Sequence, residues 1–296
     1  MKWKKKICTG YLTGLAMGLS VLLSACSHDD EGLQMPTTLY AQPADTLLAQ
    51  LAEKYPEARY AERMERASRL TILRGKNIAY VGASFVNLPE ADVAKLILCN
   101  ALGCSITTYG YGGYGYATGK NLLAYVKMMR KHAAYVLWGT TNDYFQQVPP
   151  GTASDDLAAG AGQTACSGFN AALHSLQKRY PGVPIWSFTS LKTFQHPDGY
   201  DRNSDYTNGI GYHFYDYVDA QMDCCRKAGV PCLNLWDWQQ FDTGNWSSFY
   251  FADAVHMNRD AYFLIGLKQL EWICEQLTGE TAGGQEEILT ENSSSK

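Results

Sequence analysis

The stretch Asn77-Ile78-Ala79-Tyr80-Val81-Gly82-Ala83-Ser84-Phe85 decides the fold of this chain. Its apolar first half predicts a buried strand, and Gly82-Ala83-Ser84 predicts a turn where that strand ends. Open α/β sheets bind their ligands at the carboxyl edge, so the Ser84 hydroxyl is placed where chemistry can occur. Serine is also common in turns for structural reasons, so the stretch alone assigns no reaction.

An alternation of strands and helices follows from residue 76 onward. Strands are predicted at 77–82, 104–109, 134–139, 183–189 and 231–236, and helices at 89–102, 118–132, about 154–179, 212–228 and 259–277. About five strands that alternate with helices predict a parallel, doubly wound sheet covered on both faces. The predicted fold is therefore a three-layer α/β/α sandwich.

Two later stretches add chemistry to the same edge of the sheet. Trp138-Gly139-Thr140-Thr141-Asn142-Asp143 follows the third strand, and Asp253-Ala254-Val255-His256-Met257-Asn258 precedes the last helix. A serine hydroxyl needs a base, which His256 can supply, and Asp253 can orient the imidazole from the same turn. An Asp-x-x-His spacing is frequent, so the pair can equally belong to an ordinary loop.

Attack on an ester carbonyl also requires donors for the oxygen that becomes negative. The backbone N–H of Ser84, a backbone N–H in the glycine-rich loop 110–113 and the side-chain amide of Asn142 are the candidates. Glycine suits the second position because the backbone must approach the substrate closely. The alternative is a tight turn at the glycines and a strand-end turn at Asn142.

The order of these four blocks resembles the SGNH/GDSL hydrolase family over about residues 76–277. The resemblance implies a flavodoxin-like sandwich and ester hydrolysis, with Ser84 as nucleophile, His256 as base and Asp253 as its partner. It implies oxyanion donors at Ser84, Asn142 and a glycine that best matches Gly113, with Gly110 and Gly112 left open. Ala83 and Thr140 depart from the family pattern and indicate a divergent branch.

The amino terminus predicts export. Residues 1–25 combine a basic start with an apolar run and read as a signal peptide, and Leu23-Ser24-Ala25-Cys26 resembles the lipobox of bacterial lipoproteins. We expect a lipid on Cys26, a tether over 26–43, a helical extension over 44–75, the hydrolase domain over 76–278 and a flexible tail over 279–296. The acidic run after Cys26 resembles the surface-export tag of Bacteroidetes lipoproteins. The predicted location is the cell envelope, anchored to the outer membrane and facing the periplasm or the surface.

Charge and cysteine content restrict the partners. Without residues 1–25 the chain carries 21 basic and 29 acidic residues, a net charge of −8. That balance argues against nucleic acid and against electrostatic attachment to a membrane. Nine cysteines become seven once Cys8 and Cys26 are set aside, no spacing suggests zinc, and the expected chemistry needs neither metal nor organic cofactor.

Aromatic residues in the edge loops suggest a glycan ester as substrate, because aromatic faces stack on sugar rings. The candidates are Tyr111, Tyr114, Tyr144 and Trp246, and ordinary loop packing is the alternative. Two other functions stay open: a lipase-like acylhydrolase, and a glycan-binding accessory lipoprotein that has lost turnover.

Overall fold

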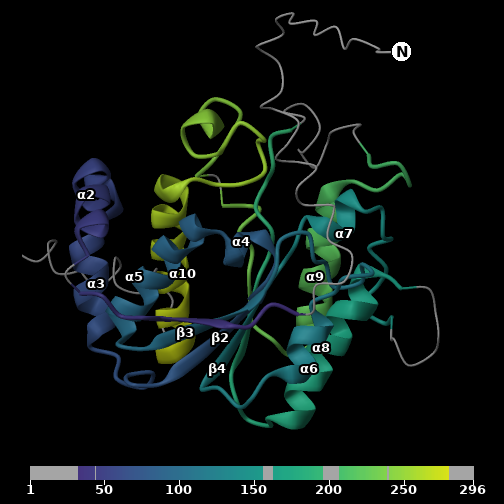
Figure 1. Ribbon diagram of the computed structural model, residues 1–296, viewed down its shortest axis with the longest axis horizontal. Coiled ribbons are helices and arrows are strands. Elements are labelled where there is room, and N and C mark those ends of the chain that lie inside the picture. Colours follow the sequence, from purple (N-terminus) through teal and green to yellow (C-terminus); the bar gives the residue numbers. More distant parts are fainter. Residues whose placement is uncertain (1–32, 44, 156–162, 196–206, 239, 280–296) are drawn as a thin grey trace, which may run out of the picture. The chain divides into compact units, whose positions relative to one another are not determined.

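A mostly parallel sheet of six strands organises the computed structural model, which describes residues 33–43, 45–155, 163–195, 207–238 and 240–279. The strand order is β1-β3-β2-β4-β5-β6 (Figure 1). The strands are β1 (Thr37–Tyr40), β2 (Asn77–Gly82), β3 (Ser105–Gly110), β4 (Ala134–Trp138), β5 (Ile185–Phe188) and β6 (Cys232–Leu233). The five parallel strands expected from the sequence are confirmed, although β6 has two residues where six were expected.

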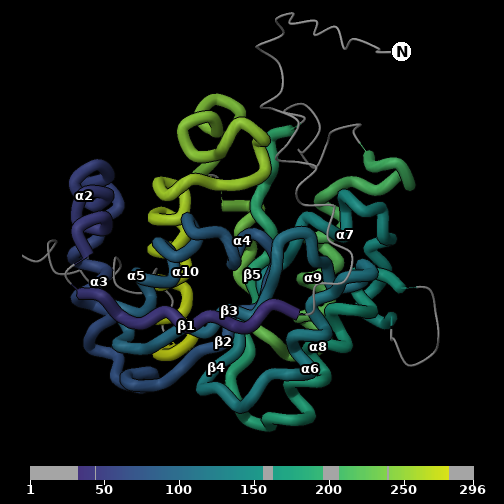
Figure 2. The backbone as a smooth tube through the Cα atoms, in the orientation of Figure 1, coloured from purple at the N-terminus to yellow at the C-terminus, as the bar shows by residue number. Residues whose placement is uncertain are grey.

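The sheet gains a strand that the sequence did not predict. β1 runs antiparallel to β3 at the edge, with Thr37 opposite Thr108 and Tyr40 opposite Ser105 (Figure 2). The hydroxyls of Thr38 and Thr107 are 2.8 Å apart across this pair. The expectation of a tether over 26–43 is therefore wrong for residues 37–40, and residues 26–32 lie outside the described part of the chain.

Helices cover both faces of the sheet (Figure 1). One layer contains α2 (Thr46–Lys54), α3 (Tyr60–Ser68), α5 (Asp92–Leu102) and α10 (Arg259–Thr278), and the other contains α6 (Leu123–Met128), α8 (Ala165–Arg179) and α9 (Phe214–Ala228). Alternate residues of β2 serve the two cores: Ile78 and Tyr80 pack on one side, Ala79 and Val81 on the other. The predicted three-layer α/β/α sandwich is confirmed.

The first helices belong to the same core as the rest of their layer. Asp45 caps α2 by accepting hydrogen bonds from the N–H groups of Leu47 and Leu48, and a 3₁₀ turn over Pro56–Ala58 separates α2 from α3. Leu48 and Leu51 are buried in the hydrophobic cluster that includes residues of α5 and α10. The segment 46–68 therefore contributes to the layer instead of standing apart from it.

Several helix boundaries differ from the sequence-based prediction. α6 starts at residue 123, not 118, because the Thr118 hydroxyl closes a turn by accepting from Gly115 N–H and donating to the Lys120 carbonyl. α8 begins after Thr164, which forms a capping box with Ser167, and residues 156–162 lie outside the described residues. Two short helices, α4 (Ser84–Asn87) and α7 (Asn142–Phe145), were not predicted.

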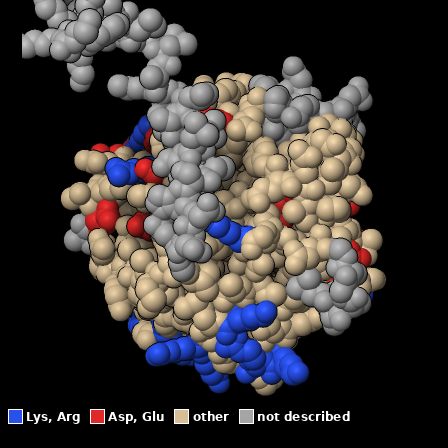
Figure 3. Space-filling model, turned by 45° about the vertical axis from the view of Figure 1, so that its right-hand side comes forward, with Lys and Arg blue, Asp and Glu red and all other residues tan. Residues whose placement is uncertain are grey.

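Basic side chains concentrate at one end of the face shown in Figure 3, and most of the described cysteines are buried. On the face shown in Figure 3, lysine and arginine side chains gather at the lower end, whereas the loop before α10 lies at the top in Figure 1. The described cysteines, residues 99, 104, 166, 224, 225, 232 and 274, are free thiols, and Cys232 alone among them is not fully buried. No helix within the described ranges is long and apolar enough to span a membrane.

Candidate active site

Ser84 stands where β2 gives way to α4. It is the first residue of α4, and 9% of its surface is exposed. A side chain at Gly82 would crowd Val86, because its Cβ would lie 3.0 Å from the nearer Val86 methyl carbon. The first N–H groups of a helix have no partner within the helix, so the backbone N–H of Ser84 is available to a ligand.

Asp253 and His256 form a tight pair in the turn before α10. His256 Nδ1 lies 2.6 Å from Asp253 Oδ2, and Asp253 Oδ1 accepts hydrogen bonds of 2.9 Å from the backbone N–H groups of Val255 and His256. Partial burial raises the pKa of Asp253, but these hydrogen bonds outweigh it and hold the pKa below its ordinary value. A carboxylate held in this way fixes the imidazole and leaves Nε2 for a substrate-side proton.

The backbone of this turn is well supported. Phe251 N–H donates to the His256 carbonyl at 2.8 Å, and Ala254 adopts a left-handed φ of 56°. Asn258 caps α10 by accepting a hydrogen bond from Ala261 N–H at 3.1 Å. The Asp253–His256 geometry is thus built into the start of α10.

Helix α10 is also tied to the Ser84 turn. The Tyr262 hydroxyl donates a buried hydrogen bond of 3.1 Å to the carbonyl of Phe85. No hydrogen bond joins the Ser84 hydroxyl to His256, although both residues are within the described part of the chain. Catalytic hydrogen bonds are often long in free enzymes and tighten when substrate binds.

The three predicted oxyanion donors come from neighbouring loops. Asn142 is half-buried, and its amide uses one N–H on the Tyr114 carbonyl at 2.8 Å, which leaves a second N–H for a ligand. Gly113 has φ +83° in a turn closed by Tyr114 N–H on the Tyr111 carbonyl, and the space around a Cβ at Gly113 is open. Gly110 differs, because a Cβ there would lie 1.8 Å from the Gly82 carbonyl oxygen, so its glycine serves strand packing.

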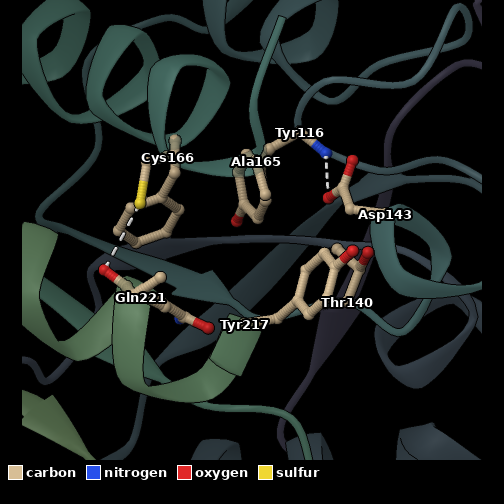
Figure 4. Close-up of a pocket in the computed structure, with 9 residues that line it drawn as sticks. Tyr116, Thr140, Asp143, Ala165, Cys166, Tyr217 and Gln221 are labelled. Carbon is tan, nitrogen blue, oxygen red and sulfur yellow. Dashed lines mark hydrogen bonds between the residues drawn. The ribbon is translucent and has the colours of Figure 1, made fainter. Parts of the chain in front are cut away.

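Asp143 supports this loop and was given no role by the sequence. It is 3% exposed, and its carboxylate accepts from the N–H groups of Tyr116 at 2.8 Å and Ala117 at 3.0 Å. Burial raises the pKa of Asp143, and these backbone donors partly offset the rise. Figure 4 shows the Tyr116–Asp143 bond beside a small cavity of about 30 Å³ that Thr140 also lines.

Lys95 is a second supporting residue, and the sequence did not predict its role. It is 4% exposed, and its ammonium donates to the Val86 carbonyl at 2.9 Å and to the Thr108 hydroxyl at 3.1 Å, beside Asp92 at 2.7 Å. Val86 belongs to the Ser84 turn, so Lys95 anchors that turn to β3. One lysine inside the apolar run 93–98 was the signal that could have revealed it.

Two of the four aromatic candidates for substrate contact lie in packed positions. Tyr144 is 2% exposed and packs between Phe214 and Tyr217, so the expectation that it offers a stacking face to substrate is not supported. Tyr114 is 8% exposed and contacts Tyr111 edge to face.

The other two candidates keep some exposed surface. Tyr111 is half-buried, and Trp246, also half-buried, stacks on Phe194 with ring centroids 6.0 Å apart. Only Tyr111 and Trp246 therefore remain as candidates for contact with substrate.

A serine, an asparagine and an Asp–His pair at one edge of a doubly wound sheet are the arrangement of an ester hydrolase. The sequence of residues 79–263 matches the model of the GDSL-like lipase/acylhydrolase family. The chain belongs to this family and is a hydrolase of ester bonds, which confirms the resemblance noted in the sequence. No curated protein shows significant sequence similarity to it.

Solved structures share the fold at low sequence identity. A protein from Lactobacillus plantarum is 20% identical, with 69% of this chain and 98% of that chain covered and a TM-score of 0.57. A possible lipase from Chitinophaga pinensis DSM 2588 is 14% identical, with 68% and 98% covered and a TM-score of 0.51. At these identities the likeness shows the architecture, not the substrate.

Proposed function

We propose that this hydrolase is a serine esterase that works through an acyl-enzyme on Ser84. The observation that carries the proposal is the contact of 2.6 Å between Asp253 Oδ2 and His256 Nδ1. This pair lies in the turn before α10, and α10 is hydrogen-bonded to the turn that contains Ser84. A protein that only binds glycans does not need a histidine oriented by a carboxylate at the same edge of the sheet as a serine. This combination favours turnover over a glycan-binding accessory role.

The reaction has two halves. Ser84 Oγ attacks the ester carbonyl carbon and its proton passes to His256 Nε2, while Asp253 stabilises the resulting imidazolium. The carbonyl oxygen becomes negative and accepts hydrogen bonds from the N–H groups of Ser84 and Gly113 and from the Asn142 amide. The alkoxide leaves with the proton held by His256. Water, deprotonated by His256, then releases the acid from Ser84.

The proposed substrate is an acetyl or short acyl ester on a carbohydrate. Of the four aromatic side chains named from the sequence, half-buried Tyr111 and Trp246 keep some exposed surface for a sugar ring. A lipase-like preference for long acyl chains is the competing proposal. Attachment to the outer membrane through a lipid on Cys26 also remains a proposal, since Cys26 lies outside the described residues.

Hydrolysis of an aryl acetate by the full chain, beside Ser84→Ala, tests the proposal. We expect turnover that falls by several orders of magnitude in Ser84→Ala and in His256→Ala. Acetylated oligosaccharides and long-chain aryl esters then separate the two substrate classes. Equal rates in the parent chain and Ser84→Ala would remove Ser84 as nucleophile, and glycan binding without turnover would favour the accessory role.

A further inference from the structure

Helix α7 and Gln146, the residue after it, contact four backbone groups of the loop that follows β3: the carbonyls of Gly113 and Tyr114 and the N–H groups of Tyr116 and Ala117. We propose that Gln146 and Asp143 are positioning residues that fix the oxyanion donor of this loop, so that α7 sets the rate of the acyl-transfer steps. The proposal rests on the proposed esterase mechanism and assigns a role to two side chains that do not touch the substrate.

Gln146 holds the loop at the proposed donor itself. Its side-chain Nε2 donates a hydrogen bond of 2.9 Å to the Gly113 carbonyl, although the glutamine is exposed. This contact fixes the peptide plane that follows Gly113. The Gly113 N–H belongs to the preceding peptide plane, which meets the held plane at the Gly113 Cα, where φ is +83°, so holding one plane restricts the rotation of the other. No hydrogen bond within the described ranges uses that N–H, so it is available to a ligand.

Asp143 holds the loop on its far side. Its two carboxylate oxygens accept from Tyr116 N–H and Ala117 N–H, as Figure 4 shows for Tyr116. A Cβ at Gly115 would lie 2.3 Å from this carboxylate, so the loop closes onto Asp143 only with glycine there. The carboxylate is almost fully buried, and the N–H groups that donate to it offset part of the cost of its desolvation.

Asn142 completes the connection between these two contacts. Its amide donates to the Tyr114 carbonyl at 2.8 Å, while the Asn142 backbone N–H donates to the Thr140 hydroxyl at 3.1 Å. Three residues of one short turn therefore hold the loop from Gly113 to Ala117. The side-chain donor and the backbone donor of the oxyanion hole cannot shift independently, and preorganised donors of this kind lower the barrier without reorganising during the reaction.

Gln146→Glu and Gln146→Ala test the proposal in the full chain. The first keeps the shape but removes the N–H donor, and the second removes the side chain. Loss of a whole oxyanion donor costs a factor of about 100 to 1,000 in kcat, so a misdirected donor is expected to cost about 10-fold. We expect this fall in kcat for aryl acetate in both variants, with KM changed less than 2-fold and the melting temperature unchanged.

A second readout reports on the oxyanion hole directly. An arylboronic acid forms a tetrahedral adduct with an active serine, and one adduct oxygen stands in for the oxyanion. We expect its inhibition constant to rise about 10-fold in the two Gln146 variants, in parallel with kcat. Gln177→Ala is the matched control, because Nε2 of Gln177 on α8 also donates a hydrogen bond of 2.9 Å to a carbonyl, that of Ala228 on α9. We expect its kcat and inhibition constant to equal those of the parent.

Asp143→Asn provides a second variant. The asparagine retains one acceptor but turns an NH₂ group toward a backbone N–H, so we expect a kcat loss larger than that of Gln146→Ala. Parent-like kcat and boronate inhibition in the Gln146 variants would overturn the proposal, as would a parallel loss in Gln177→Ala. Failure of the esterase mechanism would appear separately, as equal activity in the parent chain and Ser84→Ala.

Discussion

The Tyr262 hydroxyl donates a hydrogen bond of 3.1 Å to the carbonyl of Phe85, the residue that follows Ser84. Both groups are buried, and they join the helix that begins after His256 to the turn that presents the serine. The distance between the proposed nucleophile and the proposed base therefore depends on a contact 177 residues apart in the sequence.

Removing this hydroxyl is expected to affect both stability and activity. Tyr262→Phe leaves the Phe85 carbonyl buried without its donor, which costs about 1–3 kcal/mol of unfolding free energy. We also expect kcat for aryl acetate to fall while KM changes little, because α4 can shift relative to His256. Urea unfolding and steady-state kinetics measure the two effects.

Tyr60→Phe is the control for this variant, since Tyr60 packs on Phe263 of the same helix with ring centroids 5.6 Å apart. We expect it to retain the parent kcat. A Tyr262→Phe enzyme with the stability and kcat of the parent would show that the hydrogen bond to Phe85 does not position α4 relative to His256.

Lys95 supports the Ser84 turn from the opposite side. Lys95→Met fills a similar volume but removes the donor of the Val86 carbonyl and the Thr108 hydroxyl. Leaving that carbonyl buried and unpaired is expected to cost about 1–3 kcal/mol, and kcat should fall because Val86 is part of α4. Chemical denaturation of Lys95→Met beside Lys127→Met, an exposed lysine on α6, checks this. Equal losses in the two variants would contradict a specific role for Lys95.

The repeated glycines of the loop after β3 are expected to respond differently to alanine. Gly110→Ala places a Cβ against the Gly82 carbonyl and should cost about 3 kcal/mol or more, because two paired strands must separate. Gly113→Ala forces a left-handed φ on a residue with a Cβ, at about 1–2 kcal/mol, and should also lower kcat. Gly112→Ala meets no atom within 4 Å, so it should cost little stability.

Thermal unfolding of the three alanine variants, together with kcat, resolves which glycine is the oxyanion donor. The sequence left Gly110, Gly112 and Gly113 open. A kcat loss confined to Gly112→Ala would assign the role to Gly112 and contradict the assignment to Gly113.

The features predicted from the sequence are those set by local patterns. The apolar run 77–81 followed by Gly82-Ala83-Ser84 gave β2 and its serine, and the Asp-x-x-His spacing gave the side-chain contact between Asp253 and His256. Both depend on neighbours within a few residues, where strand periodicity and turn geometry apply.

The features that were missed depend on partners distant in the sequence. Thr37–Tyr40 forms a strand because it pairs with β3 at the edge of the sheet. Its four residues of mixed polarity contain no pattern that predicts this pairing. Asp143 lies in the quoted motif, yet its role requires Tyr116 and Ala117, which come from another loop. The sequence could not show that Tyr144 is buried, because Phe214 and Tyr217, which pack against it, come from α9.

Asp253 is expected to make stability depend on pH in a direction that its hydrogen bonds determine. Its pKa in the folded chain lies below the ordinary value, because the donors of His256 and Val255 outweigh the effect of burial. A carboxylate whose folded pKa is lowered stabilises the fold above its unfolded pKa, about 3.9, and this contribution is lost as the pH falls through the folded value. The unfolding free energy of the parent minus that of Asp253→Asn should therefore be largest near neutral pH and shrink below about pH 4. Urea unfolding between pH 3 and pH 7 measures this difference, with Asp219→Asn, at an exposed carboxylate of α9, as the control. A difference that stays constant over this range, or grows on acidification, would show that the Asp253 carboxylate is not stabilised by the His256 turn.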